Sequence, residues 1–408
     1  MLNIIFISFF LSAFLSACGQ YLFIHNTQIW QILVTSVFEA AQNSFTIALN
    51  LTGILCFWLG LMKIAETSGL TEKLAKFLSP FFQKVMPEVP QNHPAIGSVI
   101  MNMAANMLGL DNAATPIGLK AMQELQSVNP KKDTATNAQI LFLVLNASSV
   151  TILPISIIMY RQTMGSLNPS AVFVPILLAT SVSTLTGFLA VAYKQKLPVL
   201  NRTVLTCLAG FFIFILSVAF YFMSLEKDVR LRQAESLSNF ILFGVIALFI
   251  FFGAVKKINV YEKFIEGAKQ GFEIAVGIIP YLVAMLVAIA AFRASGVLDF
   301  LMLGLSKFFA FLHLDTSFIP AIPTALMKPL SGSGARAMML ETLQTYGADS
   351  FEGFVSSVIQ GSTETTFYVL AVYFGAVKIS KTRSALPCAL LADFAGITTA
   401  IVLSYFFY

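Results

Sequence analysis

Apolar residues occur along this chain in nine stretches of about 20 residues, the length of helix that spans the hydrocarbon core of a bilayer. Shorter polar segments separate them. The pattern therefore predicts nine transmembrane helices, at residues 4–24, 44–62, 136–160, 171–193, 203–225, 237–255, 272–292, 352–377 and 384–407.

Four segments between these stretches are too polar to span a membrane, yet their apolar residues recur at helical spacing. Such a pattern is typical of amphipathic helices that lie in the membrane interface. We expect interfacial helices at residues 28–42, 68–86, 259–271 and 295–312.

Two further segments, 93–128 and 316–346, are moderately apolar and are interrupted near the middle by Gly, Pro, Asn or Ser. A break at membrane depth is tolerated only where the freed backbone groups are buried in protein or line a wet cavity. The pattern predicts two re-entrant helical hairpins, each entering and leaving on one side of the membrane. For the second segment, an ordinary surface loop between two helices is the alternative.

The same order of elements occurs twice along the chain, which predicts an internal repeat. The first unit covers residues 1–196 and the second covers 235–408, with a linker transmembrane helix and loop at 197–234. Each unit would cross the membrane four times, so the linker makes the number of crossings before the second unit odd. The second repeat is therefore predicted to be inverted relative to the first, as in many secondary transporters.

Composition agrees with an all-α polytopic membrane protein. The chain is 57% hydrophobic and 11% charged, with a mean hydropathy of +0.81, whereas soluble domains carry about 25% charged residues. Of the 25 Lys and Arg residues, 17 fall on one predicted face and 8 on the other. The positive-inside rule then predicts a bacterial inner (cytoplasmic) membrane protein with a cytoplasmic N-terminus and a periplasmic C-terminus. The net charge of +5 comes from these loop residues and does not indicate nucleic-acid binding.

Several classes of function have no support in the sequence. The chain contains no GxxxxGK nucleotide-binding loop, its four cysteines form no CxxC pair, and its three histidines are scattered. No nucleophile–base pair is recognisable either, so we expect neither an enzyme nor a bound metal or cofactor.

The polar segment KPLSGSGAR, residues 328–336, is the strongest candidate for a site. Pro and Gly interrupt the helix there, and Ser333 is expected to cap the helix that follows. The unpaired N–H groups of a helix start beside Lys328 and Arg336 would favour an anion.

We expect one broken transmembrane helix in each repeat, the polar spans 136–160 and 352–377. Their polar residues and those of the hairpins would meet this segment at one central site, because an inverted repeat brings the corresponding elements together. The expected substrate-binding residues are Asn102, Asn106, Asn112, Thr115, Asn146, Ser148, Lys328, Ser331, Ser333, Arg336, Ser362, Thr363 and Thr365. An alternative for the Asn residues of the first hairpin is that they only satisfy the freed backbone.

Glu364 lies near the middle of a predicted span. A carboxylate at that depth is costly and is a functional candidate, with Lys328 or Arg336 as its expected partner. We expect Glu364 to carry a coupling proton or sodium ion, with Asp111 as a second candidate. The alternative is a buried ion pair that only holds the helices together.

The run NMAANMLGLDNAATPIGLKAM, residues 102–122, resembles the motif of spore maturation protein A, and NASSV at 146–150 fits the same pattern. The segment 328–336 and GSTETTFY at 361–368 resemble spore maturation protein B. The chain is thus similar to the two proteins fused head to tail. The resemblance implies the nucleoside-recognition, or gate, superfamily, which is similar to concentrative nucleoside transporters. Asp111 stands where that family usually has a neutral residue.

These observations predict a secondary transporter of a small polar or anionic metabolite bound between two hairpins. The alternative is a non-transporting membrane scaffold or sensor involved in envelope or spore maturation. The expected partners are the lipid bilayer, the substrate, a coupling ion and possible further copies of the same chain.

Overall fold

The computed structural model describes residues 2–90, 93–107, 111–197 and 201–408. Within them the chain is helical, and the described β contacts amount to one isolated bridge between Thr134 and Lys381. Seven described helices are long and apolar enough to cross a membrane. They are α1 (Leu2–Phe23), α2 (Ile29–Thr67), α8 (Phe173–Gln195), α9 (Arg202–Met223), α10 (Lys227–Val255), α11 (Val260–Ala294) and α17 (Ala385–Phe407). The predicted all-α polytopic class is confirmed.

The other two predicted spans are each divided into two short helices. The span 136–160 forms α6 (Asn137–Ser148) and α7 (Ile155–Thr163), and the span 352–377 forms α15 (Phe351–Ser362) and α16 (Thr366–Ala376). Pro154 immediately precedes α7, and proline disfavours a helical conformation in the residue before it. In the second break the backbones of Thr363 and Thr365 are extended, a conformation that β-branched residues favour.

Two predicted boundaries are wrong. The segments 28–42 and 44–62 form one continuous helix, the 39-residue α2, and the segments 259–271 and 272–292 form the 35-residue α11. The change from an amphipathic to an apolar pattern does not break a helix by itself. Neither junction contains a proline, and the one glycine at a junction, Gly271, is a packing residue.

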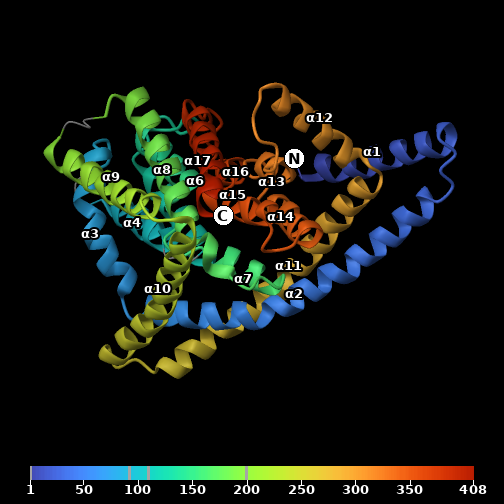
Figure 1. Ribbon diagram of the computed structural model, residues 1–408. Helices are drawn as coiled ribbons and strands as arrows, with labels where there is room; N and C mark the ends of the chain where they lie inside the picture. Colours follow the sequence, from blue (N-terminus) through green and yellow to red (C-terminus); the bar gives the residue numbers. More distant parts are fainter. Residues whose placement is uncertain (1, 91–92, 108–110, 198–200) are drawn as a thin grey trace.

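Helices α2 and α11 lie side by side along one edge of the molecule (Figure 1). Gly267 and Gly271, one turn apart on α11, face the α2 backbone: a Cβ on Gly267 would come within 2.2 Å of the Leu59 carbonyl oxygen. A Cβ on Gly271 would lie 2.7 Å from Cys56 Cα. Small residues at this spacing let two helices approach closely, which is a common basis of packing in membranes.

The remaining helices follow the same order in both halves. A glycine with positive φ, Gly69 (75°) or Gly296 (74°), separates the long helix from α3 (Leu70–Val85) or α12 (Val297–Phe311). A helical hairpin follows. The first consists of α4 (Pro94–Met107) and α5 (Asp111–Ser127), and the second of η2 (Ile319–Ala321), α13 (Ile322–Met327) and α14 (Gly332–Tyr346). Gly109, the expected centre of the first break, lies outside the described residues. A short 3₁₀ turn, η1 (Pro169–Val172), leads into α8.

Candidate functional site

The two broken helices cross each other at their breaks. The backbone N–H of Glu364 donates to the carbonyl oxygen of Ala147 at 2.8 Å, which joins one break to the end of α6. Helix α6 packs against α16, and α7 packs against α15. The two broken helices therefore run antiparallel, and their interrupted segments meet in the middle.

Each hairpin tip is bonded to the broken helix of its own half. The N–H of Ile152 donates to the Met107 carbonyl at the end of α4, and the N–H of Phe367 donates to the Pro329 carbonyl after α13, both at 3.0 Å. Backbone groups freed by a helix break must find such partners where no water is available. Four interrupted segments, two from each half, thus converge on one region.

A cavity of about 70 Å³ lies at this convergence. Its polar and charged lining comes from both halves. The first half contributes Thr151 and Ser156, and the second contributes Lys328, Arg336, Gln360, Thr363, Glu364 and Thr365. Five of the predicted site residues thus line this cavity: Lys328, Arg336, Thr363, Glu364 and Thr365.

Opposite charges share this small space. Lys328 is 4% exposed, and the Arg336 guanidinium lies over the ring of Tyr160, 5.3 Å from its centroid. The Glu364 carboxylate lines the same cavity. Two cations and one carboxylate in so small a cavity favour an anion or a strongly dipolar molecule.

The helix cap at the second hairpin differs from the prediction. Ser331, rather than Ser333, is the N-cap of α14, and its hydroxyl oxygen accepts a hydrogen bond from the Gly334 N–H at 3.0 Å. Only Ser331 has the extended backbone of a cap residue, because the helix already begins at Gly332. The hydroxyls of Ser331 and Ser333 lie 3.3 Å apart beside the cavity.

The predicted asparagines form a separate network next to this cavity. Asn106 donates to the side-chain oxygen of Asn146 at 2.9 Å, and Asn102 donates to the Ala114 carbonyl at 2.7 Å. The hydroxyl of Tyr373 lies 3.4 Å from both Asn102 and Asn146. In this conformation the three asparagine side chains bind one another, Tyr373 and the backbone.

The other predicted residues are also placed. The hydroxyls of Ser148 and Ser362 donate to carbonyls of their own helices, those of Val144 and Ile359. Thr115 is half-buried on α5. The side chains of Asp111 and Asn112 lie outside the described part of the chain.

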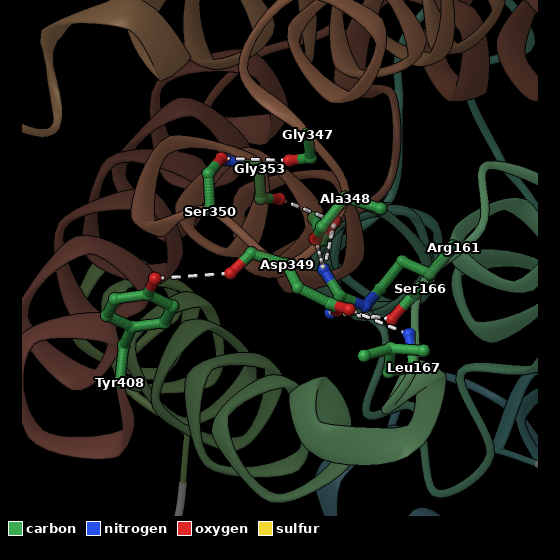
Figure 2. Close-up of polar contacts among 10 residues, drawn as sticks. Arg161, Ser166, Leu167, Gly347, Ala348, Asp349, Ser350, Gly353 and Tyr408 are labelled. Atoms are coloured by element: carbon green, nitrogen blue, oxygen red, sulfur yellow. Dashed lines mark hydrogen bonds and ion pairs between the residues drawn. The ribbon is translucent and has the colours of Figure 1, made fainter.

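A buried polar cluster joins the far ends of α7 and α15 (Figure 2). Arg161, 1% exposed, donates to the Ala348 carbonyl at 2.7 Å and to the Asp349 carboxylate at 2.9 Å. The same carboxylate accepts from the Ser166 hydroxyl and the Leu167 N–H. We call this cluster the α7–α15 clasp.

A corresponding cluster, the α6–α16 clasp, lies at the opposite ends of the broken helices. Asp133, before α6, pairs with Lys381, after α16, at 2.7 Å, and Arg383 donates to the Ala135 carbonyl at 3.0 Å. The hydrogen bond from Lys381 holds the pKa of the Asp133 carboxyl below its usual value. This clasp is exposed, with Lys381 and Asp133 side chains 68% and 55% accessible, whereas the α7–α15 clasp has its cation buried.

Comparison with known proteins identifies the family. The model of the Gate domain, described as nucleoside recognition, matches residues 48–167 and 275–380, more than half of the chain. This chain belongs to the nucleoside recognition family. It is 48% identical to spore maturation protein B of Bacillus subtilis (strain 168) over 159 residues, 39% of this chain and 88% of that protein. It is 41% identical to spore maturation protein A of the same organism over 148 residues, 36% of this chain and 76% of that protein.

The predicted family resemblance is therefore confirmed, and the chain is a multi-pass membrane protein of the nucleoside recognition family. Both matched segments of the family model include a hairpin and a broken helix. The family match thus covers the elements that converge on the cavity.

Three polar features near the cavity or the broken helices were not predicted from the sequence: Tyr373, the α7–α15 clasp and Asp393. Tyr373 and the α7–α15 clasp gave no local signal, because their partners are distant in sequence. Asp393, by contrast, is a carboxylate in the predicted span 384–407, and the argument applied to Glu364 would have found it.

Proposed function

We propose that this protein is a secondary transporter of a small polar or anionic metabolite in the bacterial cytoplasmic membrane. The proposal is non-enzymatic, and it places the N-terminus in the cytoplasm and the C-terminus outside. The observation that carries it is the central cavity, where interrupted helices from both halves meet around Lys328, Arg336 and Glu364.

The lining gives each group a role. Lys328 and Arg336 would hold the negative group of the substrate, and Thr365 would bind its neutral polar atoms. The asparagine network would open to the substrate when the first hairpin moves, since its side chains are otherwise engaged with one another.

The cavity is too small for a metabolite in the present conformation. Its volume of about 70 Å³ compares with ~300–1,000 Å³ for typical ligand sites. The conformation described therefore corresponds to a closed state. The two clasps lie at opposite ends of the broken helices, so releasing one while keeping the other would open the cavity to one side at a time.

The rival function is a non-transporting scaffold or sensor. The names of these two relatives refer to spore maturation and not to transport. A scaffold would need the polar centre only for packing, and the cavity would then remain closed.

Flux into proteoliposomes separates the two functions. Vesicles containing the purified protein are loaded with a complex metabolite extract, and efflux is profiled without choosing a substrate in advance. We expect a small set of polar or anionic metabolites to leave the vesicles, and the Lys328→Met variant to reduce that efflux about tenfold or more. Efflux equal to that from loaded vesicles without the protein, under inward and outward gradients, would favour the scaffold.

A further inference from the structure

A carboxylate that the proposed mechanism does not use lies beside the cavity. Asp393 is in the middle of α17 and is 2% exposed. One of its oxygens accepts a hydrogen bond from the Thr366 hydroxyl at 2.7 Å. Its other oxygen, Oδ1, is fully buried and has no hydrogen-bond partner among the described residues.

Two more buried oxygens near Asp393 are also without partners. Thr363, in the break after α15, is 3% exposed, and its hydroxyl lies close enough to the Asp393 carboxylate to interact with it, but the two oxygens do not form a hydrogen bond of regular geometry. Gln360, near the end of α15, lines the same cavity as Thr363, and its amide oxygen is likewise unpaired within the described residues. Leaving buried polar oxygens without partners is unfavourable, so a ligand that contacts all three would stabilise this region.

Helix packing fixes these groups in place. A Cβ on Gly396, one turn after Asp393, would lie 2.6 Å from the Thr363 side chain, so α17 approaches the break closely at this glycine. The C-terminal end of α15 adds main-chain carbonyls that cannot bond within the helix, and it is the negative end of the helix dipole. Oxygen atoms of a carboxylate, a hydroxyl, an amide and a helix end form the donor set that hard cations prefer.

We propose that Asp393, Thr363 and Gln360, with the carbonyl end of α15, form a binding site for a monovalent cation, Na⁺. A single carboxylate at the centre suits one positive charge better than two. A proton would satisfy one of the three oxygens, whereas a metal cation can contact all of them.

Charge balance gives this site a role, and that role rests on the proposed transport function. Lys328 and Glu364 are charged neighbours of Asp393. With Arg336 they make two cations and two carboxylates around the cavity. An anionic substrate adds one negative charge to this neutral group, and a cation at Asp393 restores neutrality. Substrate and Na⁺ would therefore bind together.

Thermal unfolding of the purified full-length protein in detergent tests the site without any substrate. Each sample is measured in NaCl and in choline chloride at equal ionic strength and fixed pH. We expect Na⁺ to raise the Tm of the wild type by about 3 °C, since a ligand at about a hundred times its Kd stabilises the folded state. Asp393→Asn should abolish this shift. Glu39→Gln, which removes an exposed carboxylate on α2, should keep it.

A second variant covers the case in which Asp393→Asn does not fold. Thr363→Val keeps the shape of the side chain and removes one oxygen, so the Na⁺ concentration at half-maximal shift should rise about tenfold. The site is overturned if Na⁺ does not stabilise the wild type, or if Thr363→Val and Asp393→Asn respond as the wild type does. A Na⁺ shift without any flux would retain the site and remove transport. Flux driven by a proton gradient, without a Na⁺-dependent shift in Tm, would retain transport and remove the Na⁺ site.

Discussion

Asp349→Asn lowers the Tm of the purified protein by roughly 3–4 °C, the largest stability effect we expect from a single conservative substitution. The substitution keeps the shape of the side chain but removes the charge that balances the buried Arg161 guanidinium. Breaking a buried ion pair by removing one partner costs about 3–5 kcal/mol, because the other charge stays buried. The Asp349 side chain is 40% exposed, so we expect a cost at the lower end of this range. Thermal unfolding in detergent measures the effect.

The α6–α16 clasp provides a matched control for this variant. Asp133→Asn makes the same change in the corresponding α6–α16 clasp, whose two side chains are largely exposed to solvent. The Tm of this variant should stay close to that of the wild type, since exposed ion pairs contribute little. The double variant Arg161→Met with Asp349→Asn should recover most of the loss. Equal destabilisation by both single variants would mean that burial of Arg161 does not decide the strength of the α7–α15 clasp.

Glu364→Gln reduces gradient-driven accumulation about tenfold or more, because coupling free energies are typically 1–3 kcal/mol. Gln keeps the size of the side chain and its ability to form hydrogen bonds, but the cavity then holds one carboxylate fewer against Lys328 and Arg336. An anionic substrate would no longer need a cation to balance its charge. Exchange of internal for external substrate should therefore persist while net accumulation falls.

Stability measured on the same variant separates coupling from packing. If Glu364 only held the helices together, Glu364→Gln would lower the Tm, and Glu364→Gln with Lys328→Met would restore it. We expect an unchanged Tm together with lost accumulation. Normal accumulation at normal stability would remove Glu364 from the mechanism.

The sequence predicted the spanning helices well because hydrophobic length is a local property. It did not place the breaks at Pro154 and at 363–365 within the two broken spans, although local residues there disfavour a helix. It misplaced the junctions near residues 43 and 271, where an amphipathic pattern changes into an apolar one inside a continuous helix. Neither junction contains a proline, so the change of pattern alone does not end the helix.

For the site, too, local properties were predictable from the sequence and long-range contacts were not. Lys328, Arg336 and Glu364 were predictable, since charges in apolar surroundings are conspicuous. The ion pair between Arg161 and Asp349 was not predictable, because the two segments that it joins are distant in the sequence. The neighbouring hydrogen bond from Arg161 to the Ala348 carbonyl spans 187 positions. The asparagines were predicted as ligand groups, whereas in this conformation they bind one another. A sequence pattern does not distinguish these two states.

Access to the cavity from both sides of the membrane tests the central claim most directly. Single cysteines replace Ser156 and Thr365, which line the cavity, in a protein whose native Cys18, Cys56, Cys207 and Cys388 have been replaced. A membrane-impermeant thiol reagent is applied to right-side-out and to inside-out vesicles, with Ser238→Cys, fully buried on α10, as the unreactive control. A transporter that opens to each side in turn predicts labelling of both cavity positions in both kinds of vesicle. Absence of labelling from either side, as at residue 238, would contradict the account.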